Sequence, residues 1–267
     1  MKPKNAIRDR NSIQSLARGL KILELCAKSS LPLTLTEIAN QAQLTKTTSQ
    51  RFLNTLCSLG YLRRGNNKGY VLGARVLCLS YDFLNTSSLV TIATPYLDEL
   101  SAEIGKTVNL AVLEDVQTLF LYRKEVRKFM KYDLGPGSVL PCYAGSLGKA
   151  MLAGLDDEEL KKRIDQLEFY PITLKTITSK QKLKDDIIKT RKRGYSICDQ
   201  ELSLDMYSLG VPLLDERGEV IAAINISMEF NDKGNPNLET FITVLVEKGR
   251  MISRSLGYNG PYPCYPS

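Results

Sequence analysis

Ser146 and Lys149 stand three residues apart, the spacing that places a serine nucleophile and a lysine on one helical turn. The companion motifs Ser-Asp-Asn and Lys-Thr-Gly of the penicillin-recognising enzymes occur nowhere in the chain. A phosphate loop is excluded, because only two residues separate Gly145 from Gly148 and Ala150 replaces the magnesium-binding Ser or Thr. We therefore predict a helix that begins near Gly145, whose free amides and positive dipole end can hold a carboxylate without doing chemistry.

The composition removes most other catalytic chemistry. The 267 residues include no histidine and no tryptophan, which excludes Ser-His-Asp and Cys-His catalysis and most zinc sites. The six cysteines lie at least 21 residues apart, so the sequence contains neither a metal knuckle nor a redox pair. We predict no catalytic residue, no metal and no cofactor, and we interpret the cysteines as reduced thiols of a cytoplasmic protein.

Positive charge is concentrated at the amino-terminal end. Residues 1–75 hold 13 Lys or Arg and three acidic residues, a net charge of +10, whereas the remaining residues carry a net charge of −3. A basic domain beside a near-neutral one is typical of nucleic-acid binding, because neutralising phosphates releases counterions. We expect residues 1–11 to form a disordered basic arm and residues 12–73 to form a DNA-binding domain.

Three helices and a hairpin are predicted within this domain. Apolar positions recur at helical spacing over residues 15–28. Thr34 and Glu37 have the form of a capping box at the start of a second, short helix, and Thr45 is a good N-cap for a third. Two strand-like runs between residues 61 and 72 then predict a hairpin, which completes the order of a winged helix-turn-helix.

The third helix has one face of core residues and an opposite face suited to DNA. No residue of that opposite face is acidic, and its hydroxyl, amide and guanidinium groups can reach base edges and phosphates in a major groove. The hairpin adds basic side chains that can touch the DNA backbone or minor groove. The predicted DNA-binding residues are Arg18, Thr45, Lys46, Thr47, Gln50, Arg51, Asn54, Arg64 and Lys68.

The rest of the chain predicts a linker helix followed by an α+β domain. Residues 74–86 are rich in apolar side chains, which predicts a helix that is mostly covered. Strands, then helices, then strands again over residues 87–258 indicate a mainly antiparallel sheet. The strands are expected at 107–113, 117–122, 129–133, 195–199, 206–213 and 219–227, and the helices at 156–169, 179–193 and 238–256. The proline-rich residues 259–267 are expected to form a flexible tail.

An ordered series of motifs resembles the IclR family of bacterial transcriptional regulators over nearly the whole chain. The DNA-binding part of the resemblance consists of residues 15–23, 35–39, 51–56, 59–61 and 70–73, and the later part consists of residues 194–197, Glu201, 211–212 and 218–227. The resemblance implies that the C-terminal domain is similar to the GAF fold and binds an effector. It places the effector-binding residues at Tyr143, Ala144, Gly145, Met206, Ser208, Asn225 and Ser227, with main-chain contacts at Ala144 and Gly145.

Within the family, the chain is most similar to the branch that regulates aromatic-acid catabolism by the β-ketoadipate route. Residues 199–202 (Asp-Gln-Glu-Leu) and 140–142 (Leu-Pro-Cys) carry this similarity. Members of that branch respond to compounds such as protocatechuate, 4-hydroxybenzoate or β-ketoadipate. Residues 205–208 read Asp-Met-Tyr-Ser where the branch usually has Gly-Leu-Arg-Ser, and this exchange removes an arginine that would favour a carboxylate and adds an acid that would repel it.

Asn225 and Ser227 share one face of a predicted strand. Such polarity has two interpretations. It is the outer face of an ordinary half-solvated sheet, or it is the wall of a pocket if other elements of the chain roof it.

We expect a homodimeric or tetrameric cytoplasmic regulator that binds a double-stranded DNA operator and a small organic, aromatic acid. No stretch approaches the roughly 18 apolar residues of a membrane span, so we expect no membrane partner. The genes that it controls would be those of aromatic-acid catabolism. Two alternatives stay open: a hydrolase-like enzyme that uses Ser146 and Lys149, and a DNA-binding protein that needs no ligand.

Overall fold

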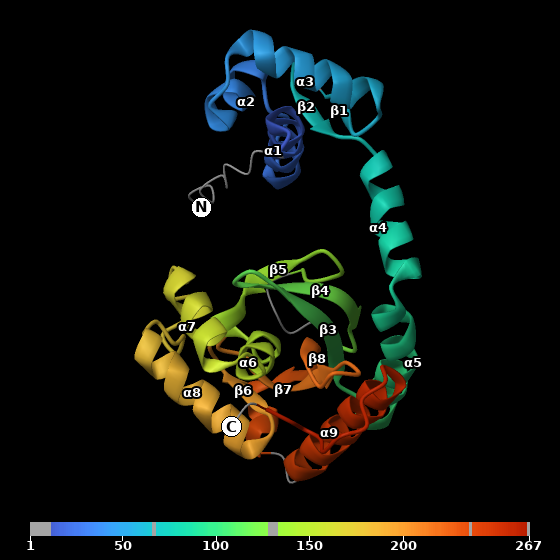
Figure 1. Cartoon of the computed structure of the whole chain (residues 1–267), viewed down its shortest axis with the longest axis vertical. Coiled ribbons are helices and arrows are strands. Elements are labelled where there is room, and N and C mark those ends of the chain that lie inside the picture. Colours follow the sequence, from blue (N-terminus) through green and yellow to red (C-terminus); the bar gives the residue numbers. More distant parts are fainter. Residues whose placement is uncertain (1–11, 66–67, 128–132, 235–236, 266–267) are drawn as a thin grey trace. The chain divides into compact units, whose positions relative to one another are not determined.

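The computed structural model describes residues 12–65, 68–127, 133–234 and 237–265. The chain divides into two compact units, Met1–Phe83 and Leu84–Ser267 (Figure 1). The expected basic arm at residues 1–11 lies outside the described residues, as do residues 66–67 of the hairpin tip and most of the strand expected at 129–133.

The first unit contains three helices followed by a two-stranded hairpin. Its elements are α1 (Gln14–Lys28), α2 (Leu35–Ala42), α3 (Lys46–Ser58), β1 (Leu62–Arg64) and β2 (Tyr70–Leu72). The two strands are antiparallel, with Leu62 opposite Leu72. Ile22, Ile38 and Leu53 from the three helices meet in one buried core, and each such side chain contributes about 1.5–3 kcal/mol through its burial. The predicted winged helix-turn-helix order is confirmed.

Hydrogen bonds from side chains fix the beginnings of α2 and α3. The Glu37 carboxylate accepts a hydrogen bond from the Thr34 amide at 2.7 Å, and the Thr34 hydroxyl accepts one from the Glu37 amide at 3.3 Å. These two bonds form the predicted capping box. The Thr45 hydroxyl accepts a hydrogen bond from the Thr48 amide at 3.2 Å, which makes Thr45 the N-cap of α3 as predicted.

The second unit is built on one six-stranded sheet. Its strands are β3 (Thr107–Glu114), β4 (Gln117–Lys124), β5 (Val139–Pro141), β6 (Ser196–Asp199), β7 (Met206–Leu214) and β8 (Val220–Glu229). The spatial order is β5-β4-β3-β8-β7-β6, and every neighbouring pair is antiparallel. The expected antiparallel α+β domain is therefore confirmed, and of the strands within the described residues the short β5 alone was not predicted from the sequence pattern.

The two faces of this sheet are covered differently. The helices of the unit are α5 (Ser88–Ile104), α6 (Ser146–Ala153), α7 (Asp157–Gln166), α8 (Lys180–Arg193) and α9 (Leu238–Ser255). Leu110, Leu209 and Ile224 point to one face, where they share an apolar core with residues of α5 and α9. The opposite face contacts α6, and every residue of α6 is buried.

Two glycines allow α6 to approach its neighbours closely. A Cβ atom added at Gly148 would lie 2.1 Å from the carbonyl oxygen of Cys142, and one added at Gly210 would lie 2.8 Å from the carbonyl oxygen of Ser146. Both separations are shorter than van der Waals contact, and the atoms that they meet belong to the backbone. The position of α6 on the sheet therefore requires glycine at both sites.

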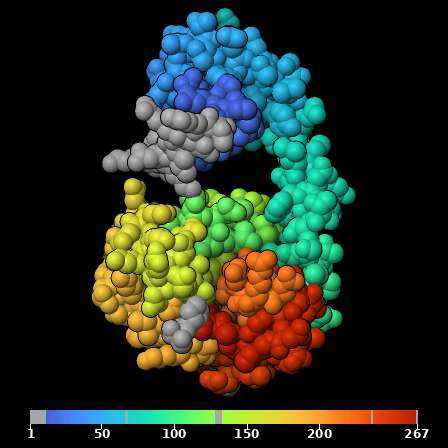
Figure 2. Space-filling model, viewed as in Figure 1, coloured from blue at the N-terminus to red at the C-terminus, as the bar shows by residue number. Residues whose placement is uncertain are grey.

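The linker helix α4 (Arg75–Thr86) forms where it is expected but is not covered. None of its residues is buried, and Leu77 and Leu79 are 68% and 56% exposed. In Figure 2 the atoms of this helix, drawn in blue-green, form surface along its length. The prediction of a mostly covered helix was wrong for the single chain. An apolar composition indicates that a helix can be covered, but it does not show which side chains cover it.

Residues 259–265 differ from the flexible tail that the proline content predicts. The Tyr262 hydroxyl donates a hydrogen bond to the Pro212 carbonyl at 2.5 Å, and it occupies the space next to Gly249 of α9. Tyr265 packs against the cluster that contains Leu183. These tyrosines attach the segment to the domain, a contribution that a proline count does not reveal.

Within residues 12–65, 68–127, 133–234 and 237–265, no single helix has both the length and the apolar composition needed to cross a membrane. Only the consecutive helices α4 and α5, taken together as a bent pair, pass that test.

We predict that Gly148→Ala lowers the free energy of unfolding by about 1–3 kcal/mol, because the added methyl group must displace the backbone of Cys142. This loss should appear although alanine favours a helix. Urea unfolding followed by circular dichroism measures it. Gly135→Ala is the matched control, since a Cβ atom there meets nothing within 4 Å; equal midpoints for the two variants would contradict the close approach.

Candidate functional site

The outer face of α3 is exposed and has no acidic residue. Lys46, Thr47, Arg51 and Asn54 are all exposed, and the segment 46–58 contains neither Asp nor Glu. The other side of the helix is anchored in the core through Leu53. Four of the predicted DNA-binding residues therefore lie together on a rigid helix and are accessible to a large partner.

Gln50 connects this face to the hairpin. Its Nε2 atom donates hydrogen bonds to Asn54 Oδ1 at 2.7 Å and to the hydroxyl of the buried Tyr70 at 3.0 Å. The Arg64 guanidinium lies 4.2 Å from the centre of the Tyr70 ring, within the range of a cation–π contact. Its Nη1 atom also donates to the Lys68 carbonyl at 3.2 Å. The structure thus holds Gln50, Asn54 and Arg64 in one connected arrangement.

The remaining predicted DNA-binding residues occupy different places. Thr45 caps α3 through the bond to Thr48, and the exposed Lys68 follows the hairpin tip. Arg18 is exposed on α1, where its Nη2 atom donates to Gln14 Oε1 at 3.3 Å. Arg18 therefore belongs to a different helix from the other predicted contacts.

A second polar region lies inside the C-terminal unit, on the sheet face beneath α6. Asn109, Ser208, Asn225 and Ser227 come from three strands, and each is at most 5% exposed. An ordinary half-solvated sheet would leave such side chains in water. Because α6 roofs them, the interpretation as simple outer-face polarity is wrong for this sheet.

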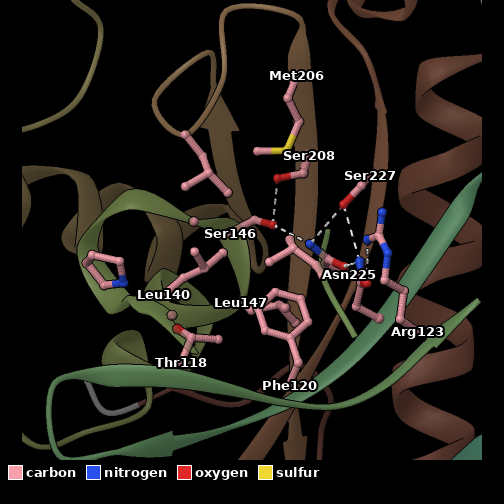
Figure 3. A pocket seen from close by; sticks show the side chains of 16 residues that line it. Thr118, Phe120, Arg123, Leu140, Ser146, Leu147, Met206, Ser208, Asn225 and Ser227 are labelled. Carbon is pink, nitrogen blue, oxygen red and sulfur yellow. Dashed lines mark hydrogen bonds between the residues drawn. The ribbon is translucent and has the colours of Figure 1, made fainter. Parts of the chain in front are cut away.

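These side chains form a continuous hydrogen-bonded network (Figure 3). Asn109 Nδ2 donates to Asn225 Oδ1 at 2.7 Å and to Ser227 Oγ at 3.3 Å. Asn225 Nδ2 donates to Ser146 Oγ at 3.1 Å, and the Ser146 and Ser208 hydroxyls are 2.8 Å apart. Buried polar groups are costly unless they are paired, so the network explains how this face tolerates burial.

The network borders a small cavity of about 20 Å³, which is room for about one water molecule. Five of the seven predicted effector-binding residues line it: Gly145, Met206, Ser208, Asn225 and Ser227. A Cβ atom added at Gly145 would meet nothing within 4 Å, so the start of α6 faces open space. The helix predicted to begin near Gly145 is confirmed.

Tyr143 and Ala144 do not line this cavity. Both belong to the apolar cluster around Leu183 and Ile187. The Tyr143 hydroxyl donates to the Tyr170 carbonyl at 3.1 Å. Tyr143 and Ala144 therefore lie away from the polar network, whereas the adjacent Gly145 lines the cavity.

A larger hollow of about 340 Å³ lies beside the cavity, with Ser227 in the wall of both. Its charged residues are paired with each other. Lys106 contacts Asp232 at 2.7 Å, and Arg127 is 3.9 Å from Glu229. The hollow is therefore polar and shares Ser227 with the smaller cavity, which holds the network of buried groups.

Both units match known proteins. The family model described as the IclR helix-turn-helix domain matches residues 15–65, and the one described as the bacterial transcriptional regulator IclR C-terminal domain matches residues 82–254. The chain belongs to the IclR family. It is therefore a DNA-binding transcriptional regulator with an effector-binding C-terminal domain, and it is not an enzyme.

Individual IclR-family relatives are similar over most of their length. The transcriptional repressor IclR of Escherichia coli is 34% identical over 92% of this chain and 90% of its own. The Pca regulon regulatory protein of Pseudomonas putida is 30% identical over 93% and 86%. The crystal structure of Thermotoga maritima IclR is 27% identical, covers 92% of this chain and 100% of its own, and has a TM-score of 0.70.

The geometry around Lys149 agrees with a regulator of the IclR family that does no catalysis. Lys149 is 1% exposed and lies 2.5 Å from Glu201 Oε1 and 2.9 Å from Asp186 Oδ2. Burial alone would lower the pKa of Lys149, but attraction to Glu201 and Asp186 outweighs it and raises that pKa above its ordinary value. Lys149 Nζ is thus held by two carboxylates, whereas the Ser146 hydroxyl pairs with Ser208 and Asn225, so the nucleophile hypothesis for this pair is wrong.

The sequence pattern missed the residues that β4 contributes to the cavity. Thr118, Phe120 and Arg123 all line it, although strict alternation along a strand would place Arg123 on the opposite face from the other two. A bulge explains the difference, because Leu121 has no partner on β3 while Phe120 pairs with Ala111 and Tyr122 with Leu110. Other lining residues that were not predicted are Asn109, Leu134, Leu140, Pro141, Ser146, Leu147, Gly148 and Leu202.

We predict that Lys149→Met lowers the free energy of unfolding by about 3–5 kcal/mol, because two carboxylates lose their buried cation. Urea denaturation at neutral pH is the measurement. Lys182→Met, which changes an exposed residue of α8, should change the stability by no more than about 0.5 kcal/mol. A loss as small as that of the control would contradict the buried ion cluster.

Proposed function

We propose that α3 enters the major groove of an operator and that the residues on its outer face contact the DNA. Lys46, Thr47, Gln50, Arg51 and Asn54 would reach base edges and phosphates from this helix. Arg18, Thr45, Arg64 and Lys68 would contact the phosphate backbone or the minor groove beside it. The exposed, acid-free face of α3 and the net charge of +10 in residues 1–75 support this proposal.

We propose that the C-terminal unit binds a small organic acid in the cavity beneath α6. The observation that carries the proposal is the enclosed polar network, because Ser146, Ser208, Asn225 and Ser227 bring hydroxyl and amide groups to one cavity. The start of α6 at Gly145 adds the positive end of a helix dipole, which favours an anion. Tyr143 and Ala144, predicted from the resemblance, would act only indirectly, behind the helix start.

An aromatic acid is the effector that the resemblance favours. The motif similarity at residues 199–202 and 140–142, together with the 30% identity to the Pca regulon regulatory protein, supports control of aromatic-acid catabolism. A short aliphatic acid is a second candidate, because a cavity of about 20 Å³ would need to enlarge less for it than for an aromatic ring. Either ligand would have to move the cavity wall, which includes Leu202 in the turn between β6 and β7 and Met206 at the start of β7.

We propose that the regulator acts as a homodimer or tetramer. The exposed leucines Leu77 and Leu79 of α4 support self-association, since an apolar helix surface is stabilised when a second copy covers it. A two-fold dimer would present two α3 helices to the two halves of a near-palindromic operator. Effector binding would change operator affinity through a coupling of about 1–3 kcal/mol.

We predict that Arg51→Ala weakens binding of the full chain to its operator by about 1–3 kcal/mol. The operator is a duplex selected from a random pool with the unaltered protein, and gel-shift titration gives the affinity. Arg217→Ala removes an exposed charge from a turn of the C-terminal unit and should leave the affinity unchanged. Undiminished binding by Arg51→Ala would contradict the role of α3.

We predict that at least one acid in a panel of aromatic and short aliphatic acids raises the melting temperature. A ligand at 100 times its dissociation constant adds about 2.7 kcal/mol to the stability of the state that binds it, which is a shift of several degrees for a domain of this size. Thermal unfolding with each acid is the measurement. If no acid shifted the transition, the alternative of a DNA-binding protein without a ligand would be favoured.

A further inference from the structure

The side-chain amide of Gln50 on α3 is anchored to a buried hydroxyl of the hairpin. Gln50 Nε2 donates a hydrogen bond to the Tyr70 hydroxyl at 3.0 Å, and Tyr70 is 1% exposed. A buried hydroxyl that loses its partner destabilises the folded state. Rotation of the Gln50 amide away from Tyr70 is therefore disfavoured, and the hairpin sets the direction of a side chain on the helix proposed to bind DNA.

Tyr70 is itself held in place by its neighbours. It lies opposite Arg64 in the hairpin, and its backbone amide and carbonyl exchange hydrogen bonds with Leu33 at 2.8 and 3.1 Å. The Arg64 guanidinium covers the Tyr70 ring. A Cβ atom added at the preceding Gly69 would lie 2.6 Å from Pro32 Cβ, so the backbone here is closely packed as well. Tyr70 is therefore a fixed point to which the Gln50 amide is attached.

Both amide protons of Gln50 are used within the DNA-binding unit. One is donated to Tyr70 and the other to Asn54 Oδ1, at 2.7 Å. A primary amide has two donor protons and one carbonyl acceptor. The carbonyl oxygen Oε1 is therefore the group that Gln50 can offer to a partner, and it accepts hydrogen bonds. Lys46 and Arg51, which are exposed on the same helix, can only donate them.

The base edges of a major groove offer two kinds of partner to such an oxygen. The amino groups N6 of adenine and N4 of cytosine donate, whereas N7 of the purines, O6 of guanine and O4 of thymine accept. A glutamine with an unrestrained amide turns to bind either kind. Because the protons of Gln50 are occupied, its Oε1 atom pairs with an amino group and is repelled by a base oxygen. The restraint converts a permissive side chain into a selective one.

On this basis, and resting on the proposed entry of α3 into the major groove, we infer that Gln50 is a specificity-determining residue whose Oε1 atom accepts a hydrogen bond from the amino group of adenine or cytosine. Tyr70 is the positioning residue. It is buried and acts through Gln50, because its hydroxyl occupies one amide proton. Loss of that hydroxyl releases the proton, allows the amide to turn and makes the protein tolerant of other base groups.

The inference is tested on the full chain with base analogues in the operator duplex that the unaltered protein selects. Purine replaces each adenine in turn, and pyrimidin-2-one replaces each cytosine, so that each duplex lacks one amino group. At one position or more, the missing amino group should weaken binding in gel-shift titration by about 2- to 10-fold, which is the net value of one hydrogen bond. The two series distinguish adenine from cytosine as the source of that group.

Three variants assign this penalty to residues. Gln50→Ala should bind the natural duplex and the sensitive analogue duplex equally. Tyr70→Phe keeps the ring but should remove most of the penalty at the same position, whereas a purely structural role of Tyr70 would weaken binding to both duplexes alike. Tyr61→Phe is the matched control, because its ring also faces an arginine, Arg75 at 5.5 Å, and it should preserve the penalty. The analogue series on the unaltered protein and Gln50→Ala hold even if Tyr70→Phe folds poorly.

The outcomes separate this inference from the function on which it rests. No penalty in either series on the unaltered protein, or a penalty that Gln50→Ala retains in full, would overturn the role of Gln50. An undiminished penalty in a folded Tyr70→Phe would overturn the positioning role of Tyr70. Weaker binding by Arg51→Ala would in each case still support the entry of α3 into the groove. Failure of the unaltered chain to select any duplex would overturn both the inference and the DNA-binding proposal.

Discussion

The burial of polar groups between α6 and the sheet is the constraint on which the rest of the structure depends. A sheet face with Asn109, Ser208, Asn225 and Ser227 cannot be covered unless those groups find partners. They bond to one another and to Ser146. Among the buried side-chain atoms of the described cavity wall, Arg123 Nε and Thr118 Oγ1 are the two without a hydrogen-bond partner. The face is thus nearly satisfied by its own side chains.

The surrounding elements hold this arrangement in place. Glycine at positions 148 and 210 lets α6 lie close to the backbone of its neighbours. Lys149 joins α6 to Glu201, in the turn between β6 and β7, and to Asp186 of α8. The residue after Glu201, Leu202, lines the cavity. Movement of that turn is therefore opposed by a buried ion pair, which connects the cavity wall to the stability of the domain.

The sequence predicted those parts that depend on local signals. The capping box of Thr34 and Glu37 and the N-cap at Thr45 depend on residues close together in the sequence. Helices α2 and α3 begin directly after these caps, as predicted. The missed parts depend on contacts distant in sequence. Arg123 reaches the cavity because a bulge interrupts the alternation of β4. Tyr143 lies outside the cavity, where its hydroxyl donates a hydrogen bond to the Tyr170 carbonyl. The exposed Leu77 shows the same limit, since composition does not reveal what covers a helix.

The central claim is that the acid in the cavity and the operator on α3 affect each other's binding. Linkage requires the effect to be reciprocal. The most direct measurement is the affinity of the full chain for its tightest acid, by calorimetry, with and without saturating operator duplex. We predict a change of about 5- to 150-fold, equal to the change that the acid causes in operator affinity. Equal acid affinities in the two titrations would contradict the account.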